Sequence, residues 1–444
     1  MRLNTAPKNT AVTHEGAPAA KMNAMQALRR SVLACLLWED SFYESGEEIG
    51  ARIASLAVIV PPEELAALAI EAREKQNLWH VPLLLLSVLA HTGKGKSLVR
   101  QTIERVIQRS DELAEFLVIH AKMNGVTPDK LKSKLSAQMK RGLASAFRKF
   151  DSYQLSKYDR AGAVRLRDVL FLVHPKPVND EQQALWNQLV KNELAVPDTW
   201  ETELSAGKDK KETFERLIRE RKLGYFALIR NLRNMVEAGV DETLVNDAII
   251  ARKGGVERVL PFRFVSAVSA APTYAKALSV ALLAAVKTLP PLPGKTIVMV
   301  DTSGSMQSPL SAKSKVQRVE AAASLAALIN GDVRLFQFAS GVEEVPFFPG
   351  LAGIETVRGR IGRVGHGTDI GLAVEVANRL PHDRLIVISD EQSMGRVPDP
   401  VAKRAYMINV AAYQNGVGYG RWVHLDGFSE AVLKWIAEYE LAMS

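Results

Sequence analysis

The chain has 444 residues, of which 47% are hydrophobic and 24% charged, a composition typical of a globular protein and not of a disordered or membrane protein. The length exceeds what one hydrophobic core supports and predicts two or three domains. Hydrophobic runs such as Leu83–Leu89 and Ala277–Val286 are shorter than the roughly 20 residues that span a bilayer. No secretion signal is visible in the first twenty residues, and Cys35 is the single cysteine, so we expect a cytoplasmic protein without disulfides or membrane association.

The formal net charge is +8, and most of it lies in one segment. Between Asp129 and Asp168 there are eleven basic and four acidic residues, a net charge of +7. The remainder of the chain is therefore close to neutral. A local excess of one sign predicts contact with a polyanion more strongly than the total charge does.

After a polar segment, residues 1–21, which we expect to be disordered or extended, residues 22–289 have a helical pattern. In Glu64–Lys75 and again in Thr102–Gln108, apolar residues recur at the spacing of one helix face. The side chain of Ser110 is expected to cap the helix that follows it.

Breaks between these helices recur at close intervals, for example at Pro61-Pro62, Thr127-Pro128-Asp129 and Gly254-Gly255. A long series of short amphipathic helices with close breaks is typical of a helical solenoid of HEAT type. The alternative is an irregular helical bundle.

The periodicity changes after Pro290–Gly294, which we interpret as a stiff linker, and residues 294–444 alternate short β-branched runs with helical segments. Strands are predicted at Thr296–Val300, Val333–Phe338, Leu385–Ser389 and Tyr406–Val410, and helices at Val316–Leu328, Ile370–Leu380 and Glu430–Tyr439. This alternation predicts a doubly wound parallel sheet. Ligands of such sheets bind beyond the carboxyl ends of the strands.

The first predicted strand runs directly into the sequence DTSGS, which contains Asp301, Ser303 and Ser305. The glycine between the two serines permits the sharp turn that would let the three side chains converge. Two later loops offer Thr368, before a predicted helix, and Asp390, at the end of a predicted strand. All five are hard oxygen donors, which favour Mg²⁺, with Mn²⁺ or Ca²⁺ as alternatives. The simpler reading is a polar loop whose serines cap a helix.

This constellation resembles the metal-ion-dependent adhesion site of the von Willebrand A fold, whose pattern is Asp-x-Ser-x-Ser followed by a distant Thr and Asp. The resemblance implies a bound divalent ion with one open coordination position, which an acidic group of a partner fills. Walker loops, the second aspartate of haloacid-dehalogenase enzymes and a Ser/His/Asp arrangement are absent from the sequence. His366 is expected to shape the metal loop rather than to act as a base. We therefore predict a protein without enzymatic activity.

A helical solenoid followed by a von Willebrand A domain resembles the Ro autoantigen (TROVE) family, in particular its bacterial members. Three stretches support the resemblance: Gly224–Met235 (GYFALIRNLRNM), Arg258–Ser266 (RVLPFRFVS) and Leu425–Val432 (LDGFSEAV). It covers about residues 22–441. It implies a ring that holds small noncoding Y RNA outside and the single-stranded ends of misfolded RNA in its central hole. It also implies a role in RNA quality control or maturation, with a 3′–5′ exoribonuclease as partner. We expect the protein to be a monomer.

The basic segment agrees with RNA binding, because its cations alternate with Phe147, Phe150, Tyr153 and Tyr158. Cations neutralise phosphates, and aromatic rings can stack on unpaired bases. For any single residue, a place in the core or on a solvated face is the simpler interpretation.

The candidate RNA contacts are basic side chains of this segment and of one later helix. The resemblance places Lys157 and Arg160 where the family contacts Y RNA, whereas Leu166 stands where a histidine is expected. The full set is Lys140, Arg141, Arg148, Lys149, Lys157, Arg160, Arg165 and Arg167, with Arg230 and Arg233 at i and i+3 on one helix face. Pairing with Glu237 is the alternative for the last two.

A second hypothesis is a protein-interaction scaffold that binds no RNA and uses the metal site to hold an acidic residue of a partner. The basic segment discriminates between the two, since a scaffold has no need of a net charge of +7 within forty residues.

Overall fold

The computed structural model describes residues 11–33, 44–251, 259, 262–310, 316–427 and 431–443. They belong to two compact units: unit 1, made of residues 1–49 and 209–444, and unit 2, made of residues 50–208. Cys35, the Gly254-Gly255 break and parts of two family-like stretches (residues 258, 260–261 and 428–430) lie outside the described residues.

Unit 2 is built from helices. They are α2 (Gly46–Ile59, which begins in unit 1), α3 (Pro62–Glu74), α4 (His80–Thr92), α5 (Lys96–Val106), α6 (Asp111–Met123), the 3₁₀ helix η1 (Pro128–Lys134), α7 (Ala137–Phe147), α8 (Ser152–Tyr158), α9 (Leu166–Val173), α10 (Asp180–Lys191) and α11 (Trp200–Ser205). The predicted helix at Glu64–Lys75 is therefore confirmed.

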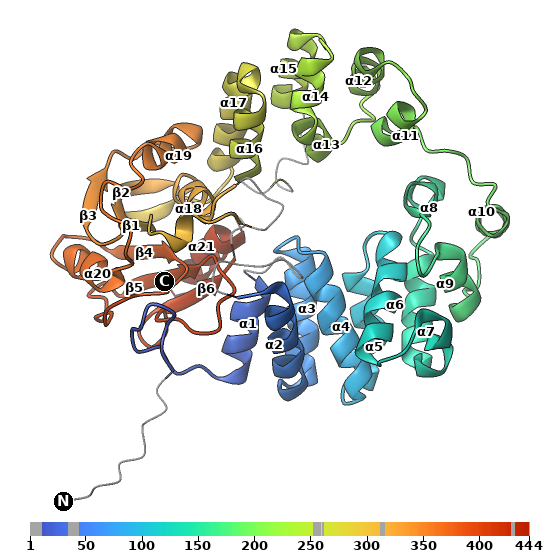
Figure 1. The fold of residues 1–444 in the computed structure, drawn as a ribbon, viewed down its shortest axis with the longest axis horizontal. Helices are drawn as coiled ribbons and strands as arrows, with labels where there is room; N and C mark the ends of the chain where they lie inside the picture. The colour runs from blue at the N-terminus through green and yellow to red at the C-terminus, as the bar shows by residue number, and fades with distance from the viewer. Residues whose placement is uncertain are drawn as a thin grey trace, which may run out of the picture. The chain divides into compact units, whose positions relative to one another are not determined.

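These helices form a two-layered solenoid, as the succession from α3 to α9 in Figure 1 shows. Helix α5 packs on α3 and α7, and α7 packs on α9, which makes one layer. Helices α4 and α6 pack on each other in a second layer, and α4 also contacts α3 and α5. The hydrophobic run Leu83–Leu89 is completely buried in α4, because this helix lies between its neighbours. The HEAT-like interpretation is thus confirmed, and the irregular bundle is not.

Two details of the helix ends differ from expectation. Ser110 lies at the N-cap of α6, but its hydroxyl donates to the carbonyl of Gln154 at 2.8 Å instead of capping the helix. Helix α5 ends at Val106, before the predicted end at Gln108, because Ile107 is already extended. The contact of Ser110 with α8 joins residues 44 positions apart, which local sequence does not reveal.

Unit 1 contains the helices on either side of unit 2 in the sequence. They are α1 (Ala24–Leu33), α12 (Lys210–Arg219), α13 (Tyr225–Arg230), α14 (Leu232–Glu237), α15 (Glu242–Ala251), α16 (Phe262–Ala270), η3 (Pro272–Tyr274) and α17 (Ala275–Lys287). Helix α16 packs against α13, α14 and α17 and against two helices of the sheet region, α18 (Arg318–Ala326) and α19 (Leu351–Arg358). It therefore connects the helical part of unit 1 to the sheet.

A six-stranded sheet forms the rest of unit 1, in the order β3-β2-β1-β4-β5-β6. The strands are β1 (Leu292–Asp301), β2 (Gly331–Phe338), β3 (Val342–Val345), β4 (Arg384–Ser389), β5 (Arg404–Asn409) and β6 (Val423–Asp426), and the remaining helices are η4 (Ser305–Gln307), α20 (Ile370–Asn378) and α21 (Ala431–Met443). All neighbouring pairs are parallel except β2 and β3, so β3 is an antiparallel edge strand. The predicted doubly wound α/β class is confirmed.

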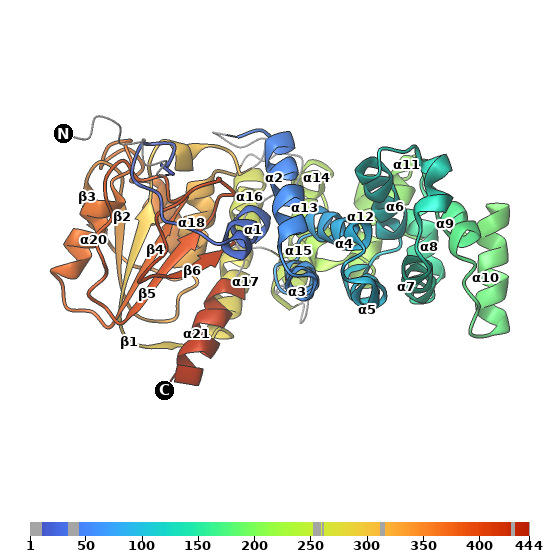
Figure 2. The ribbon, with the colours of Figure 1, turned by 90° about the horizontal axis from the view of Figure 1, so that it is seen from below.

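Helices cover both faces of this sheet, with α20 on one side and α18 and α21 on the other (Figure 2). Met299 of β1, Leu385 of β4 and Met407 of β5 pack with Ile370 and Val374 of α20 in one buried cluster. Burial on both faces explains why the strands are continuous hydrophobic runs rather than alternating ones.

The stiff linker predicted at Pro290–Gly294 is wrong in part, because β1 begins inside it. Leu292 pairs with Gly331 of β2, and its N–H donates to the carbonyl of Asn330 at 2.8 Å. The register then shifts before Lys295, where the proline and glycine interrupt the ladder. Nowhere in the described part of the chain is there a helix long and apolar enough to cross a membrane.

The described residues before α1 form a small turn, in which Val12 pairs antiparallel with Pro18, and they are held along the loops that follow β4 and β5. The hydroxyl of Thr13 donates to the carbonyl of Ser393 at 2.8 Å, and the amide of Asn415 donates to the carbonyl of Val12 at 2.9 Å. The N–H of Ala20 donates to the carbonyl of Gly416 at 2.9 Å. The first described residues therefore belong to the same folded body as the last ones.

Candidate functional site

Two aspartates lie at the ends of β1 and β4, the neighbouring strands between which the strand order of the sheet reverses. Asp301 is the last residue of β1, and Asp390 directly follows β4, the neighbouring strand. The hydroxyl of Ser389 donates to Asp301 Oδ2 at 2.5 Å, and all three residues are fully buried. Doubly wound sheets bind their ligands at this crevice, because loops from the two halves diverge there.

The loop after β1 folds back over Asp301 and brings both serines to it. The N–H of Ser303 donates to Asp301 Oδ1 at 2.9 Å, and the hydroxyls of Ser303 and Ser305 lie 3.4 Å apart. The Ser305 hydroxyl in turn forms a hydrogen bond with Asp390. Four of the five predicted ligands thus lie in one hydrogen-bonded group.

The fifth predicted ligand, Thr368, lies on a loop that a backbone hydrogen bond joins to the loop after β1. The N–H of Gly304 donates to the carbonyl of His366 at 2.8 Å, which joins the two loops. Thr368 is buried, and its carbonyl accepts from the N–H of Met394 at 2.8 Å. His366 itself is exposed, with its ring 3.4 Å from the side-chain amide of Gln307. The histidine therefore contributes its carbonyl to the shape of the loop.

The two buried carboxylates repel one another. Burial and the charge of Asp390 raise the pKa of Asp301 to about 7, and burial raises the pKa of Asp390 despite its bond to Ser305. Asp390 Oδ2 is buried and has no hydrogen-bond partner among the described residues. A cation between two such carboxylates would offset their mutual repulsion with its positive charge. It would also interact with the Asp390 oxygen that has no hydrogen-bond donor.

The residues therefore fit a hard divalent ion. The donor atoms are carboxylate and hydroxyl oxygens, which suit Mg²⁺, Mn²⁺ or Ca²⁺ better than softer metals. Among the described residues no group of three or more His, Cys, Asp or Glu is placed to hold a metal. A site here must consequently depend on hydroxyl ligands.

Arg30 of α1 also reaches this region, which no local sequence pattern predicts. Its fully buried guanidinium donates to the carbonyl of Asp390 at 3.2 Å and to Glu391 at 2.8 Å. It also donates to the carbonyl of Tyr413 at 2.6 Å. Although burial opposes ionisation, Arg30 and His424 lower the pKa of Glu391 to about 2. Arg30 thus holds the loop that carries Asp390.

The candidate RNA contacts of unit 2 fall into two groups. Arg141, Arg148 and Arg160 are exposed and Lys140 is half-buried, and in the described part of the chain none of these four side chains forms an ion pair. They are available to phosphates.

Lys157 is half-buried, contacts the hydroxyl of Tyr153 at 3.3 Å and forms no ion pair in the described part of the chain. The other three candidates of the segment have protein partners. The ammonium group of Lys149 donates to the carbonyls of Glu104 and Ile107, at 3.0 Å for the latter, where it covers the carboxyl end of α5. Arg165 pairs with Asp159 at 2.7 Å, and Arg167 lies 4.0 Å from Asp168. A phosphate would have to compete with these partners, so we rank these three below the exposed arginines.

Two of the four aromatic residues considered for base stacking lie in the core. Phe147 and Phe150 are 0% and 3% exposed, and Phe147 packs edge-on against Trp186. Their expected stacking on bases is therefore wrong. Tyr153 is 46% exposed and Tyr158 half-buried, so only these two can offer a ring to a ligand.

Arg230 and Arg233 are exposed but do not share one helix as expected. Helix α13 ends at Arg230 and α14 begins at Leu232, with the buried Asn231 between them. The amide of Asn231 donates to the carbonyl of Ala227 at 2.9 Å and so stabilises the break. Arg233 lies 3.6 Å from Glu237, the pairing considered as its alternative role.

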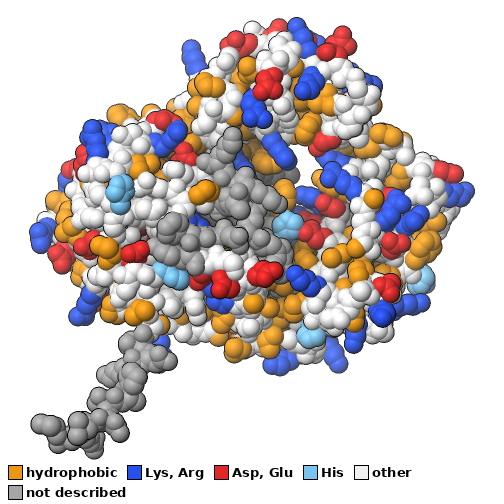
Figure 3. Space-filling view, viewed as in Figure 1, with side chains coloured by type: hydrophobic (Ala, Val, Ile, Leu, Met, Phe, Trp, Pro, Cys, Tyr) orange, Lys and Arg blue, Asp and Glu red, His pale blue; other side chains and the backbone are white. Residues whose placement is uncertain are grey.

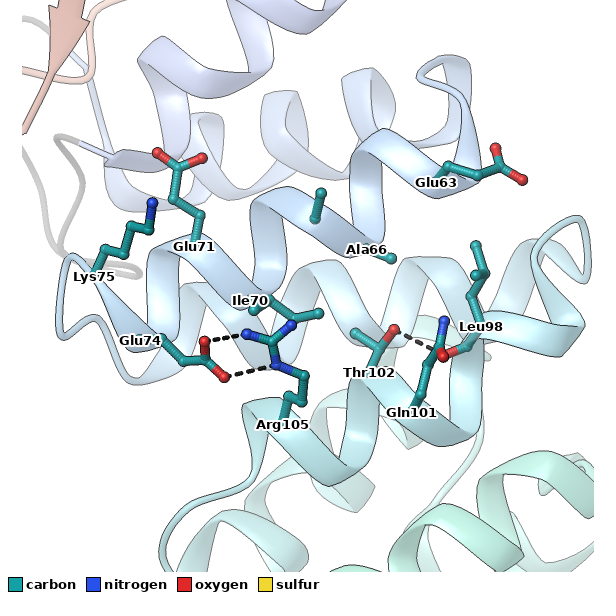
Figure 4. Close-up of a pocket in the computed structure, with 11 residues that line it drawn as sticks. Glu63, Ala66, Ile70, Glu71, Glu74, Lys75, Leu98, Gln101, Thr102 and Arg105 are labelled. Carbon is teal, nitrogen blue, oxygen red and sulfur yellow. Dashed lines mark hydrogen bonds and ion pairs between the residues drawn. The ribbon is translucent and has the colours of Figure 1, made fainter. Parts of the chain in front are cut away.

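A groove between α3 and α5 is unsuited to nucleic acid (Figure 4). Its lining includes Glu63, Glu71 and Glu74, and the last of these is paired with Arg105. On the face shown in Figure 3, basic and acidic side chains are interspersed rather than gathered in one basic surface.

Comparisons with known proteins agree with this architecture. The sequence model of the TROVE domain matches residues 190–273, from the end of α10 to η3. The fold is similar to that of the Ro (RSR) protein of Deinococcus radiodurans, with a TM-score of 0.57. The two sequences are 16% identical, and the likeness covers 94% of this chain and 100% of that one. The matched stretch includes Gly224–Met235 and Arg258–Ser266.

Proposed function

We propose that this chain is an RNA-binding, non-enzymatic protein of the TROVE (Ro) type. It would bind small structured noncoding RNA of the Y type and the single-stranded ends of misfolded RNA. The role would be in RNA quality control or maturation, with a 3′–5′ exoribonuclease carrying out the cleavage. The protein is expected to act as a monomer whose helices close into a ring.

The observation that carries this proposal is the set of exposed cations in unit 2. In the described part of the chain, the side chains of Arg141, Arg148 and Arg160 form no ion pair with a carboxylate, although acidic residues are abundant elsewhere on the surface. Phosphates supply most of the affinity of proteins for RNA, because each contact releases a condensed counterion. Unpaired guanidinium groups in one short segment suit that chemistry.

The test is a titration of the full chain with a structured RNA that carries a single-stranded tail, followed by fluorescence anisotropy at several salt concentrations. Affinity should fall steeply with salt, with a log–log slope of roughly 0.7–0.9 per phosphate contact. The RNA should remain intact on a denaturing gel. Absence of binding at physiological salt, or cleavage of the RNA, would contradict the proposal.

We further propose that Asp301, Ser303, Ser305, Thr368 and Asp390 hold one divalent ion, with Mg²⁺ favoured. The fit of the site supports this: two buried carboxylates with raised pKa values, and one carboxylate oxygen without a donor. A bound ion would supply positive charge for an acidic group of a protein partner. RNA binding should depend little on it, since the two aspartates neutralise the ion.

The scaffold hypothesis remains the second candidate, because the same metal site could serve a protein that binds no RNA. The ratio of absorbance at 260 and 280 nm, measured on the purified protein before and after ribonuclease treatment, separates the two. Copurifying RNA supports the first function. A protein free of nucleic acid that also fails the titration supports the scaffold.

A further inference from the structure

Five side chains of unit 2 form an alternating stack of rings and cations, which we name the cation–aromatic ladder: Trp79, Arg109, Tyr158, Lys157 and Tyr153. The guanidinium carbon of Arg109 lies 4.5 Å from the ring centre of Trp79 and 4.8 Å from that of Tyr158. The ammonium nitrogen of Lys157 lies 5.7 Å from the ring centre of Tyr158 and 5.5 Å from that of Tyr153. Each cation thus lies close to two rings.

The ladder joins residues at three helices of unit 2. Trp79 directly precedes α4, Arg109 lies just before α6, and the other three residues belong to α8. The hydrogen bond from Ser110 to the carbonyl of Gln154 ties the beginning of α6 to α8 at this place. Loops along one edge of a solenoid form a continuous surface, which is where such proteins often bind extended ligands.

The two ends of the ladder are open. Trp79 is 45% exposed and Tyr153 is 46% exposed, whereas Tyr158 in the middle is half-buried. The cations hold these rings in place: a guanidinium or ammonium beside an aromatic face attracts it electrostatically. The end rings are therefore both accessible and restrained, so a planar ligand loses less entropy by stacking on them than on mobile side chains.

The charge of the ladder favours an anion. Arg109 is balanced by Asp111, whose Oδ1 lies 3.0 Å from Arg109 Nε. Lys157 contacts the hydroxyl of Tyr153 at 3.3 Å and forms no ion pair with any carboxylate in the part of the chain that the structure describes. Arg160, also without an ion pair there, follows directly after α8. A ligand that stacks on the ladder would meet two cations that can take its phosphates.

We propose that the cation–aromatic ladder is a stacking platform for the unpaired bases of single-stranded RNA. Trp79 and Tyr153 take bases on their open faces, while Arg109 and Lys157 act as positioning residues. The inference rests on the proposed RNA-binding function and specifies which part of the RNA this surface binds. Every base has a π face, so the platform accepts any sequence, but it excludes duplexes, whose bases already stack on each other.

The test compares Trp79→Leu and Tyr153→Leu with the unaltered full chain. The probes are fluorescein-labelled oligouridylate, oligoadenylate and a blunt RNA duplex. Each substitution should weaken binding of both single strands about tenfold, as expected for the loss of one base–aromatic stack, and leave duplex binding unchanged. Phe171→Leu is the matched control, because Phe171 is 52% exposed on α9 of the same unit but lies outside the ladder.

A second readout separates stacking from a structural role. Trp79→Phe keeps a flat ring and should retain most of the single-strand affinity, and thermal melting should show all variants folded. Oligouridylate should quench the fluorescence of the unaltered protein more than that of Trp79→Phe, since a base stacked on Trp79 quenches that indole.

Failure of the ladder and failure of RNA binding give different results. If Lys157→Glu with Arg160→Glu weakens RNA binding but both leucine variants bind like the unaltered chain, the protein binds RNA and the platform is refuted. Equal losses for single strands and duplex would also refute it. If the unaltered chain binds none of the probes, the ladder and the proposed function fall together.

Discussion

The candidate metal site of unit 1 and the candidate RNA surface of unit 2 are built in opposite ways. The first is closed: Asp301 and Asp390 are fully buried and are assembled from two strands, two loops and a helix of the N-terminal region. The second is open, and its side chains come from one contiguous segment with few partners. A closed site depends on the complete fold, whereas an open surface tolerates the loss of single residues. The two regions should therefore respond differently to mutation.

Asp301→Asn should have the largest effect, because Asp301 and Asp390 supply the two carboxylates among the five proposed ligands of the candidate metal site. We expect Mn²⁺ binding to fall below detection in titrations followed by electron paramagnetic resonance. The circular dichroism of the helices should not change. Asp332→Asn, at an exposed position of β2, serves as the control and should bind Mn²⁺ normally. Undiminished Mn²⁺ binding by Asp301→Asn would place the ion elsewhere.

Arg30→Met comes next, since it leaves Glu391 as a buried carboxylate with one partner fewer. Removal of one member of a buried ion pair costs about 3–5 kcal/mol, so the free energy of unfolding of unit 1 should fall by that amount in urea. Arg29→Met, at a half-buried position of the same helix, is the comparison and should cost much less. Similar losses for both would mean that the charge of α1, rather than the geometry at Arg30, matters.

Lys157→Glu combined with Arg160→Glu tests the open surface. Two attractions are removed and two repulsions added, so RNA binding should weaken, and the salt slope should become shallower by about two. Lys208→Glu combined with Lys210→Glu makes the same change of charge in a mixed-charge stretch, where Lys208 pairs with Glu203 at 2.6 Å. If both double variants lose affinity equally, the attraction is nonspecific.

The smallest effects should distinguish two neighbouring cations. Lys149→Met removes a cation from the carboxyl end of α5 and should lower the stability of unit 2 by about 0.3–1 kcal/mol, with little effect on RNA affinity. Arg148→Met should do the reverse, because Arg148 is exposed and its side chain has no protein partner among the described residues. Thermal melting and anisotropy on the same samples measure both quantities. If both variants changed stability and RNA affinity alike, Lys149 and Arg148 would not have different roles.

The sequence predicted the order of elements well where long-range packing imposes a strong local pattern. Strands such as Leu385–Ser389, buried on both faces, are continuous hydrophobic runs and were located within one residue. The edge strand β3 was not predicted, because its four residues include two glutamates and one face is open. Strand β6 and helix α19 were missed for the same kind of reason: both are short and weakly patterned.

The two candidate sites differ in the same respect. Spacing and position along the strands predicted the group around Asp301 and Asp390, because parallel strands bring their carboxyl ends to one edge. Arg30 could not be predicted, since it lies 360 residues before the carbonyl that it contacts. In the basic segment, composition showed an excess of positive charge. It did not show that Lys149 hydrogen-bonds to a backbone carbonyl or that Arg165 forms an ion pair within the protein. Trp79 and Arg109 lie outside that segment in the sequence, and the packing of the solenoid helices brings them next to it.

The contact of Thr13 and Arg30 with the loops after β4 and β5 also governs the order in which the chain can fold. These residues leave the ribosome early, but their partners at positions 390–416 are made about 360 residues later, a delay on the order of half a minute at bacterial or eukaryotic elongation rates. Unit 2 is contiguous and can fold during that interval. Unit 1 is interrupted in the sequence by unit 2 and cannot complete its fold during that interval. The native contacts of α1 can therefore form only when synthesis is nearly complete. A nascent chain truncated before Ser389 should therefore have a protease-resistant solenoid and a protease-sensitive N-terminus.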